Sequence, residues 1–295
     1  MTTFSPRVAL LGFGEVGGIL AQELGAQGAR VTAYDRQITP AMITAAERCG
    51  CRLAERLPTA LADAELIFSV VTAGNTLAVA EQCAPLLHAG QYFFDLNSAA
   101  PHTKRAAAQV IQRADDARYV EVAVMAPVPP KRLQTPLLLG GPAAAEGGER
   151  LQRLGFNASV YSERIGEASA IKMCRSVMIK GLEALTVECL HAARRYGVEQ
   201  PVLDSLHASF PSLGWDDRLP HYLISRVAEH GRRRAEEMGE VVKTLQDVGV
   251  EPHQSRATVL SQLGLVEAMK AQEIGYSQLE PFVWQQALEA IYGKL

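Results

Sequence analysis

The chain has 295 residues, of which 48% are hydrophobic and 21% charged, and its formal net charge is −3. This composition is typical of a globular protein and excludes collagen-like and disordered classes. The slightly acidic balance, without an extended basic block, argues against nucleic acid or an anionic membrane as a partner. Because a typical domain has about 100–200 residues, we expect two domains.

The five cysteines are too scattered for a disulfide framework, and no pair has zinc-ligand spacing. The seven histidines show no metal-binding pattern either, so we expect no metal site. The sequence has no signal-peptide pattern and no apolar run long enough to span a membrane. We therefore expect a protein of a reducing compartment, the cytoplasm.

The first half of the sequence alternates between two kinds of segment. Short runs rich in β-branched and aromatic residues predict buried strands at Arg7–Leu11, Arg30–Tyr34, Glu65–Val71, Gln91–Leu96, Arg118–Met125, Pro136–Leu139 and Ser159–Tyr161. Amphipathic segments between them predict helices at Glu15–Gly28, Pro40–Gly50, Asn75–Gly90, Pro101–Ala114 and Pro142–Gly155. This alternation predicts an α/β fold, a mostly parallel, doubly wound Rossmann-type sheet with helices on both faces.

The pattern changes after Arg164, and no further strand is predicted. Helical periodicity without proline runs over Gly166–Gly197, and later helices are expected at Val202–Phe210, Pro220–Leu245, His253–Ala271 and Tyr276–Tyr292. We divide the chain into a dinucleotide-binding domain, residues 1–164, and an all-helical substrate and dimerisation domain, residues 165–295. Because the first helix is longer than so small a domain needs, we expect a homodimer built on the helical halves.

A glycine motif, Gly12-Phe13-Gly14-Glu15-Val16-Gly17, directly follows the first predicted strand. Gly12 permits a tight turn, Gly14 lets the backbone approach a pyrophosphate, and Gly17 lets helix and strand pack closely. The helix that begins here presents its free N–H groups to the phosphates. The motif therefore predicts a dinucleotide site.

The second predicted strand ends at Asp35, where a carboxylate can accept hydrogen bonds from the adenine ribose. Asp35 favours NAD because a carboxylate repels the 2′-phosphate of NADP. The neighbouring Arg36 can pair with that phosphate, so NADP remains an alternative. The other candidates for cofactor contacts are Phe13, Glu15, Val16, Val71, Thr72 and Asn97.

Four stretches resemble the β-hydroxyacid dehydrogenase family, which includes 3-hydroxyisobutyrate and 6-phosphogluconate dehydrogenases. The first is the glycine motif, Gly12–Gly18, and the second, Asp95–Pro101, resembles the family's D-x-S-T-x-x-P loop beside the nicotinamide. Residues Glu121–Val128 occupy the position of the family's D-A-P-V-S-G-G substrate loop. The fourth, Gly166–Ser176, is similar to the G-x-G-x-x-x-K-x-x-N-N helix that carries the catalytic lysine.

The resemblance implies that Lys172 is catalytic and that Ser98 binds substrate. The chain also departs from the family pattern. Met125, followed by Ala126 and Pro127, replaces the serine and paired glycines, while Arg175 and Ser176 replace the two asparagines. These departures imply a divergent branch, with a C-terminal domain of uncharacterised function. Met125, Arg175 and Ser176 join Ser98 as substrate-binding candidates.

The residues themselves support proton transfer. On a helix, Lys172 shares a broad face with Arg175, Ser176, Lys180 and Glu183. Burial lowers the pKa of a lysine and so makes it usable for taking the proton of an alcohol as hydride leaves. A solvated helix lysine is the alternative. Similarly, Arg175 either forms a salt bridge or binds a carboxylate, and Ser98 either caps a turn or binds substrate.

The sequence thus predicts an NAD(P)-dependent oxidoreductase that acts on a small β-hydroxy acid or its 3-keto product, with Lys172 as general acid and base. An imine or carbonyl reductase of the same fold is one alternative, and a non-catalytic dinucleotide-binding sensor is another. The run Arg232-Arg233-Arg234 is predicted as a solvated helix face, with an anion-binding patch as its alternative.

Overall fold

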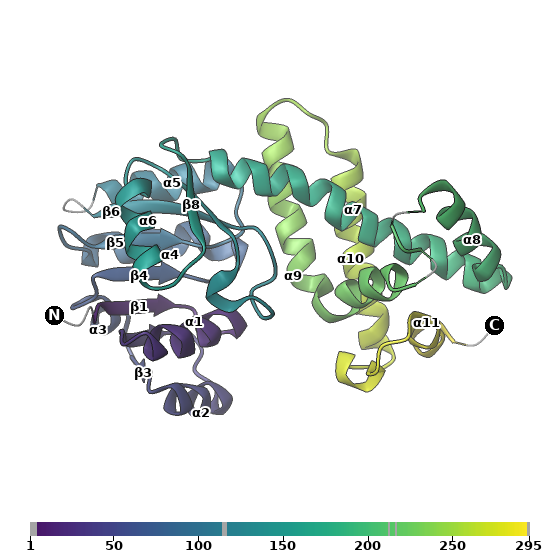
Figure 1. Ribbon diagram of the computed structural model, residues 1–295, viewed down its shortest axis with the longest axis horizontal. Helices are drawn as coiled ribbons and strands as arrows, with labels where there is room; N and C mark the ends of the chain where they lie inside the picture. The colour runs from purple at the N-terminus through teal and green to yellow at the C-terminus, as the bar shows by residue number, and fades with distance from the viewer. Residues whose placement is uncertain (1–4, 114–116, 212, 216, 294–295) are drawn as a thin grey trace. The chain divides into compact units, whose positions relative to one another are not determined.

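The computed structural model describes residues 5–113, 117–211, 213–215 and 217–293. The strands in these residues are β1 (Arg7–Leu11), β2 (Arg30–Tyr34), β3 (Arg52–Leu53), β4 (Leu66–Ser69), β5 (Tyr92–Asp95), β6 (Arg118–Val124), β7 (Leu137–Gly140) and β8 (Ala158–Ser162). They form one sheet in the order β3-β2-β1-β4-β5-β6-β7-β8 (Figure 1). All neighbouring strands pair in parallel except β6 and β7. The expected mostly parallel sheet is confirmed.

Helices cover both faces of this sheet (Figure 1). Alternate strand residues point to opposite faces, so Leu10 of β1 lies in one core and Ala9 in the other. Because both faces are buried, the inner strands β1, β4 and β5 are nearly continuous buried runs, and their residue composition indicated them in the sequence. One core includes residues of α1 (Glu15–Ala26), α2 (Pro40–Cys49) and α6 (Ala144–Arg153), and the other includes residues of α3 (Leu57–Leu61), α4 (Thr76–Cys83) and α5 (Pro101–Gln112).

The structure differs from the sequence expectations at short elements. Strand β3 and helix α3 were not predicted, because two and five residues are too few to show a periodicity. The helix expected at Asn75–Gly90 is instead α4 between two 3-10 turns, Ala73–Asn75 and Ala84–Leu86. Pro85 lies in the second turn, where it cannot continue a helix. Ala114, the expected end of α5, lies outside the described residues.

The second half of the chain is helical, as expected. Its helices are α7 (Glu167–Tyr196), α8 (Glu199–Ser209), α9 (Leu219–Asp247), α10 (His253–Ala271) and α11 (Trp284–Tyr292). Leu190, Val227, Leu265 and Trp284 are buried in one common apolar core. A Cβ on Gly231 of α9 would lie 2.6 Å from the backbone oxygen of Gln262, so glycine permits the close packing of α9 on α10.

One helix expectation in this half is wrong. The segment Tyr276–Tyr292 is not a single helix: a 3-10 turn, Tyr276–Leu279, is followed by non-helical residues up to α11. Pro281 lies in this break. In the described part of the chain, every helix is too short or too polar to cross a membrane.

The chain divides into two compact units, residues 1–173 and 174–295, which we call the α/β unit and the helical unit. The division falls inside α7, so that the first turns of this helix, including Lys172, belong to the α/β unit. The boundary expected between residues 164 and 165 lies in the segment just before α7.

An ion pair is buried at the carboxyl end of β5. The side chains of Asp95 and of Lys104 on α5 are each 1% exposed, and Lys104 Nζ lies 2.8 Å from Asp95 Oδ1. The ammonium also donates to the Asp95 backbone oxygen, and the Tyr119 hydroxyl donates to Asp95 Oδ2 at 2.7 Å. Burial, together with the charge of Asp95, raises the pKa of Tyr119 well above its ordinary value, so the hydroxyl stays a proton donor.

Replacing Lys104 by methionine should lower the free energy of unfolding by about 3–5 kcal/mol, because the buried Asp95 carboxylate would lose its counter-ion. Urea unfolding measures this loss. Arg153→Met is the matched control: the Arg153–Glu149 pair leaves 65% and 72% of its side chains exposed. We expect a loss below about 1 kcal/mol there. Equal losses in the two variants would contradict the importance of the buried pair.

Candidate active site

The glycine motif forms the turn between β1 and α1. Gly12 has φ +98°, and a Cβ there would lie 2.7 Å from the backbone oxygen of Val70. A Cβ on Gly17 would lie 2.2 Å from the Gly12 oxygen, so a side chain at either position would disrupt the turn. A Cβ on Gly14, the N-cap of α1, would meet no atom within 4 Å. Among the described residues, no side chain caps the start of α1 and the space at Gly14 is open, which suits a phosphate group.

Asp35 follows β2 and holds this turn. Its Oδ2 accepts a hydrogen bond from the Phe13 N–H at 2.8 Å, and its Oδ1 accepts one from the Gln37 N–H at 3.0 Å. Asp35 is half-buried, whereas Arg36 is exposed. A glycine turn, an open helix start and a carboxylate after the second strand together fit a bound NAD(P).

The loop after β5 carries Asn97 and Ser98. The Asn97 N–H donates to Asp95 Oδ1 at 3.0 Å, and its Nδ2 donates to Ser69 Oγ at 2.9 Å. Asn97 is only 4% exposed, yet its Oδ1 has no hydrogen-bond partner among the described residues. A buried acceptor without a donor fits a ligand that brings a donor, and NAD(P) offers an amide and several hydroxyls.

Lys172 and Ser98 meet in the structure. Lys172 Nζ donates a hydrogen bond to Ser98 Oγ at 2.5 Å, across 74 positions of sequence. Both residues are half-buried. Two separate sequence motifs thus bring a lysine and a hydroxyl into contact, and this pair can exchange a proton with a substrate oxygen.

Glu121 of β6 holds the start of α7. This residue is fully buried, and its Oε2 and Oε1 accept hydrogen bonds from the N–H groups of Gly166 at 2.6 Å and Ser169 at 2.7 Å. A carboxylate there satisfies two N–H groups of the helix start and interacts favourably with the helix dipole. The sequence motifs assign Glu121 no role of its own. The available signal was an acidic residue inside an otherwise apolar strand.

The remaining candidates lie at the ends of the parallel strands or just after them. Thr72 accepts a hydrogen bond from Asn75 Nδ2 at 2.7 Å, and a Cβ on Gly12 would lie 3.3 Å from Val71 Cγ1. Met125 is half-buried, and its N–H donates to the Pro136 oxygen. In α1, Glu15 is exposed, whereas Val16 packs against the core. The carboxyl edge of a parallel sheet is the usual position of a nucleotide site.

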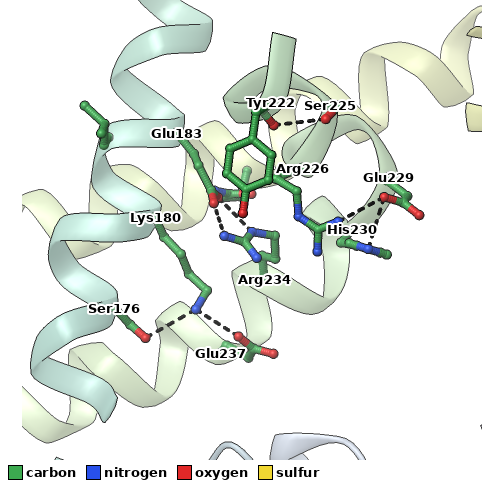
Figure 2. Close-up of polar contacts among 12 residues, drawn as sticks. Ser176, Lys180, Glu183, Tyr222, Ser225, Arg226, Glu229, His230, Arg234 and Glu237 are labelled. Carbon is green, nitrogen blue, oxygen red and sulfur yellow. Dashed lines mark hydrogen bonds and ion pairs between the residues drawn. The ribbon is translucent and has the colours of Figure 1, made fainter. Parts of the chain in front are cut away.

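Arg175, Ser176 and Lys180 belong to the helical unit. Arg175 is exposed. Figure 2 shows Lys180 pointing toward two partners, with its Nζ 2.9 Å from Glu237 Oε2 and 3.3 Å from Ser176 Oγ. Lys180 is 6% exposed, so this contact joins α7 to α9 inside the unit. The substrate contacts expected of Arg175 and Ser176 remain predictions.

A second buried ion pair of the helical unit lies beside the Lys180–Glu237 pair. Glu183, which is 1% exposed, binds Arg234 through two hydrogen bonds and accepts a third from Gln262 Nε2 at 3.1 Å. The expectation of a solvated face is therefore wrong for Arg234, because it has a buried partner. Arg232 does lie at the surface, where it pairs with Glu267.

The histidine in this cluster is neutral near pH 7. Burial and the charges of Arg226, Arg233 and Arg234 lower the pKa of His230 to about 4. Its Nε2 lies 3.2 Å from Glu229 Oε2, and Figure 2 shows this contact between the neutral ring and the carboxylate. Lys180, Arg226 and Arg234 each have a glutamate partner, and we therefore regard this cluster as structural.

Comparison with known proteins gives two matches to families. The chain matches the "NAD binding domain of 6-phosphogluconate dehydrogenase" over residues 7–146 and a "domain of unknown function (DUF1932)" over residues 193–262. A conserved hypothetical protein from Sinorhizobium meliloti 1021 is 36% identical, with 98% of this chain and 96% of that one covered and a TM-score of 0.73. A conserved protein of unknown function is described as structurally similar to 3-hydroxyacid dehydrogenases. It is 30% identical, with 88% of this chain and 97% of that chain covered and a TM-score of 0.68.

Two enzymes share the fold at lower identity. The 3-hydroxyisobutyrate dehydrogenase of Mycobacterium tuberculosis, solved with L-serine, is 12% identical over 98% of this chain and 100% of its own, with a TM-score of 0.71. An imine reductase from Aspergillus terreus is 18% identical over 95% of this chain and 99% of its own, with a TM-score of 0.58. These two likenesses concern the fold alone.

The α/β unit thus carries an NAD-binding domain, and the chain as a whole has the fold of 3-hydroxyacid dehydrogenases and imine reductases. It belongs to the β-hydroxyacid dehydrogenase family, in the divergent branch whose C-terminal half carries the domain of unknown function. The resemblance carried by the four sequence motifs is confirmed.

If Asp35 binds the adenine ribose, Asp35→Ala should weaken NADH binding more than NADPH binding. A charge-assisted hydrogen bond contributes about 1.5–3 kcal/mol, which corresponds to about a tenfold to hundredfold change in the ratio of the two dissociation constants. Fluorescence titration of both cofactors measures this ratio. Loosening of the turn at Phe13 would affect both cofactors alike, so the ratio isolates the ribose contact. Asp63→Ala, at an exposed position, is the control. An unchanged ratio would refute the assignment.

Proposed function

We propose that the protein is an NAD-dependent oxidoreductase that interconverts a small β-hydroxy acid and its 3-keto product. The observation that carries this proposal is the hydrogen bond between Lys172 and Ser98, next to the carboxyl edge of an NAD-binding domain. Bound NAD supplies the hydride acceptor for oxidation and, when reduced, the hydride donor for the reverse reaction. The carboxylate of Asp35 favours NAD over NADP.

In this proposal Lys172 moves the proton. As a neutral amine it takes the hydroxyl proton of the substrate during oxidation, and as an ammonium it returns that proton to the keto oxygen during reduction. Ser98 accepts a hydrogen bond from Lys172 and so orients the amine, while its own proton remains available to the substrate oxygen. Asn97 Oδ1, a buried acceptor, is proposed to bind a donor group of the cofactor.

An imine reductase is the second candidate, and the loop after β6 favours it. Met125, Ala126 and Pro127 offer few donors for a carboxylate, because Pro127 lacks an N–H and the Met125 N–H already donates to the Pro136 oxygen. An ammonium at Lys172 would then protonate the nitrogen of the product amine. Cofactor absorbance with a panel of hydroxy acids and cyclic imines separates the two. Tight cofactor binding without turnover of any substrate would favour the sensor instead.

Lys172→Ala should lower kcat by about 10²–10⁴-fold, which is the usual contribution of general acid–base catalysis. The affinity for the cofactor should change little, because the glycine turn and Asp35 lie at other strand ends. Lys172→Arg should not restore the rate, since a guanidinium does not release its proton near neutral pH. Steady-state kinetics and cofactor titration measure both effects.

Lys243→Ala is the control, because Lys243 is 53% exposed and pairs with a neighbour on its own helix, Glu240. Lys180→Ala is less suitable, because it would leave the half-buried Glu237 without its ammonium partner. A Lys172→Ala protein that keeps more than about a tenth of the wild-type kcat would refute the role of Lys172.

We further propose that the protein is a homodimer formed through the helical units. Met178 and Leu185 lie seven residues apart on α7, on the same side of the helix, and are 73% and 54% exposed. A second copy would remove these side chains from water on both chains at once.

Light scattering should give about twice the chain mass of 31.9 kDa. Met178→Asp with Leu185→Asp should give monomers, whereas Ile43→Asp, on the exposed side of α2, should not. A monomeric wild-type protein at micromolar concentration would refute the proposal.

A further inference from the structure

Two buried carboxylates lie opposite each other at the carboxyl edge of the sheet. Asp95 of β5 and Glu121 of β6 are paired in the strand register and are 1% and 0% exposed. Asp95 accepts a hydrogen bond from the N–H of Asn97, directly before Ser98. Glu121 accepts hydrogen bonds from the start of the helix that carries Lys172. The two partners in the lysine–serine contact are therefore held by neighbouring strands.

The contacts of Glu121 determine how α7 begins. Its two oxygens bind two different N–H groups, those of Gly166 and Ser169, so the carboxylate fixes both the position and the direction of the first turn. The fit around it is close, since a Cβ on Gly140 would lie 2.7 Å from Glu121 Oε2. Gly166 itself has φ +102°, a conformation that favours glycine.

Lys172 lies close to the helix start that Glu121 caps. It follows Ser169 by three residues, about one turn of helix. Side chains on a helix incline toward its N-terminus, so the Lys172 side chain extends back toward the end that Glu121 holds. A small displacement of the first turn would therefore move Nζ away from Ser98, and a misplacement of about 1 Å can cost about 10²-fold in rate.

We propose that Glu121 is a positioning residue: by capping α7 from β6, it sets the distance between Lys172 Nζ and Ser98 Oγ, and through it the rate of proton transfer. The proposal rests on the function proposed above for Lys172. Glu121 itself touches neither substrate nor cofactor in this role. Its effect passes through two backbone hydrogen bonds.

Glu121→Gln is the variant that tests this. The glutamine has nearly the same shape, but it offers one acceptor oxygen and turns an NH₂ group toward the other backbone N–H, so one of the two hydrogen bonds is lost. The matched control is Glu167→Gln. Glu167 lies in the same first turn and carries the same charge, but its side chain is 34% exposed and pairs with Arg164 at the surface.

Four measurements are made on each variant. Amide hydrogen exchange reports the N–H groups of Gly166 and Ser169. The Cε NMR resonance of Lys172, in protein with labelled lysine and assigned by its loss in Lys172→Arg, reports the contact with Ser98, with Ser98→Ala as the reference for a broken contact. Cofactor titration gives Kd, and steady-state kinetics give kcat and KM. All are recorded well below the melting temperature of each variant.

Glu121→Gln should speed exchange at the amide that loses its acceptor, shift the Lys172 resonance toward its position in Ser98→Ala, and lower kcat by about 10²-fold with Kd and KM unchanged. Glu167→Gln should leave the resonance and kcat at their wild-type values. A wild-type Lys172 resonance in Glu121→Gln would overturn the proposal, and so would losses of kcat and cofactor affinity in equal measure. If the wild-type protein turns over no substrate, the proposed function fails, whereas the resonance still decides the positioning role.

Discussion

Buried charge at the carboxyl edge of the sheet is the constraint on which the rest of the α/β unit depends. A carboxylate removed from water is stable only where donors surround it, and Asp95 and Glu121 obtain theirs from different sources. Asp95 is satisfied by Lys104, Tyr119 and a backbone N–H, whereas Glu121 is satisfied by the first turn of α7. Because the donors include segments that carry Asn97, Ser98 and Lys172, neither segment can shift without leaving a charge unsatisfied.

Hydrophobic periodicity, together with glycines at the ends of segments, predicted most of the secondary structure. Strands β1 and β2 and helix α10 have the expected bounds, because each has a clear pattern and a marked end. The two-residue β3 was missed, since so short a run has no period. The helix expected from Tyr276 is interrupted in the structure, and Pro281 lies in the break between the 3-10 turn and α11.

The motifs located Lys172 and Ser98, but they could not show how the two are held. That Asp95 faces Glu121 follows from strand register, which depends on the whole sheet and not on a local pattern. Burial of Lys180 and Arg234 was likewise not predicted, because their partners lie on α9 and α7 and charged residues on a helix are usually solvated. The signal that was available, an acidic residue within an apolar strand or helix face, identifies the residue without its partner.

The hydrogen bond from Phe13 to Asp35 has a consequence for protein engineering. A carboxylate after the second strand is the obvious position to change when cofactor preference is to be moved from NAD to NADP. In this chain the same carboxylate holds the glycine turn, so its removal would loosen the phosphate site for either cofactor. A redesign toward NADP is better directed at the exposed side chain of Gln37, because Gln37 contacts Asp35 through its backbone N–H and the neighbouring Arg36 can already pair with the 2′-phosphate.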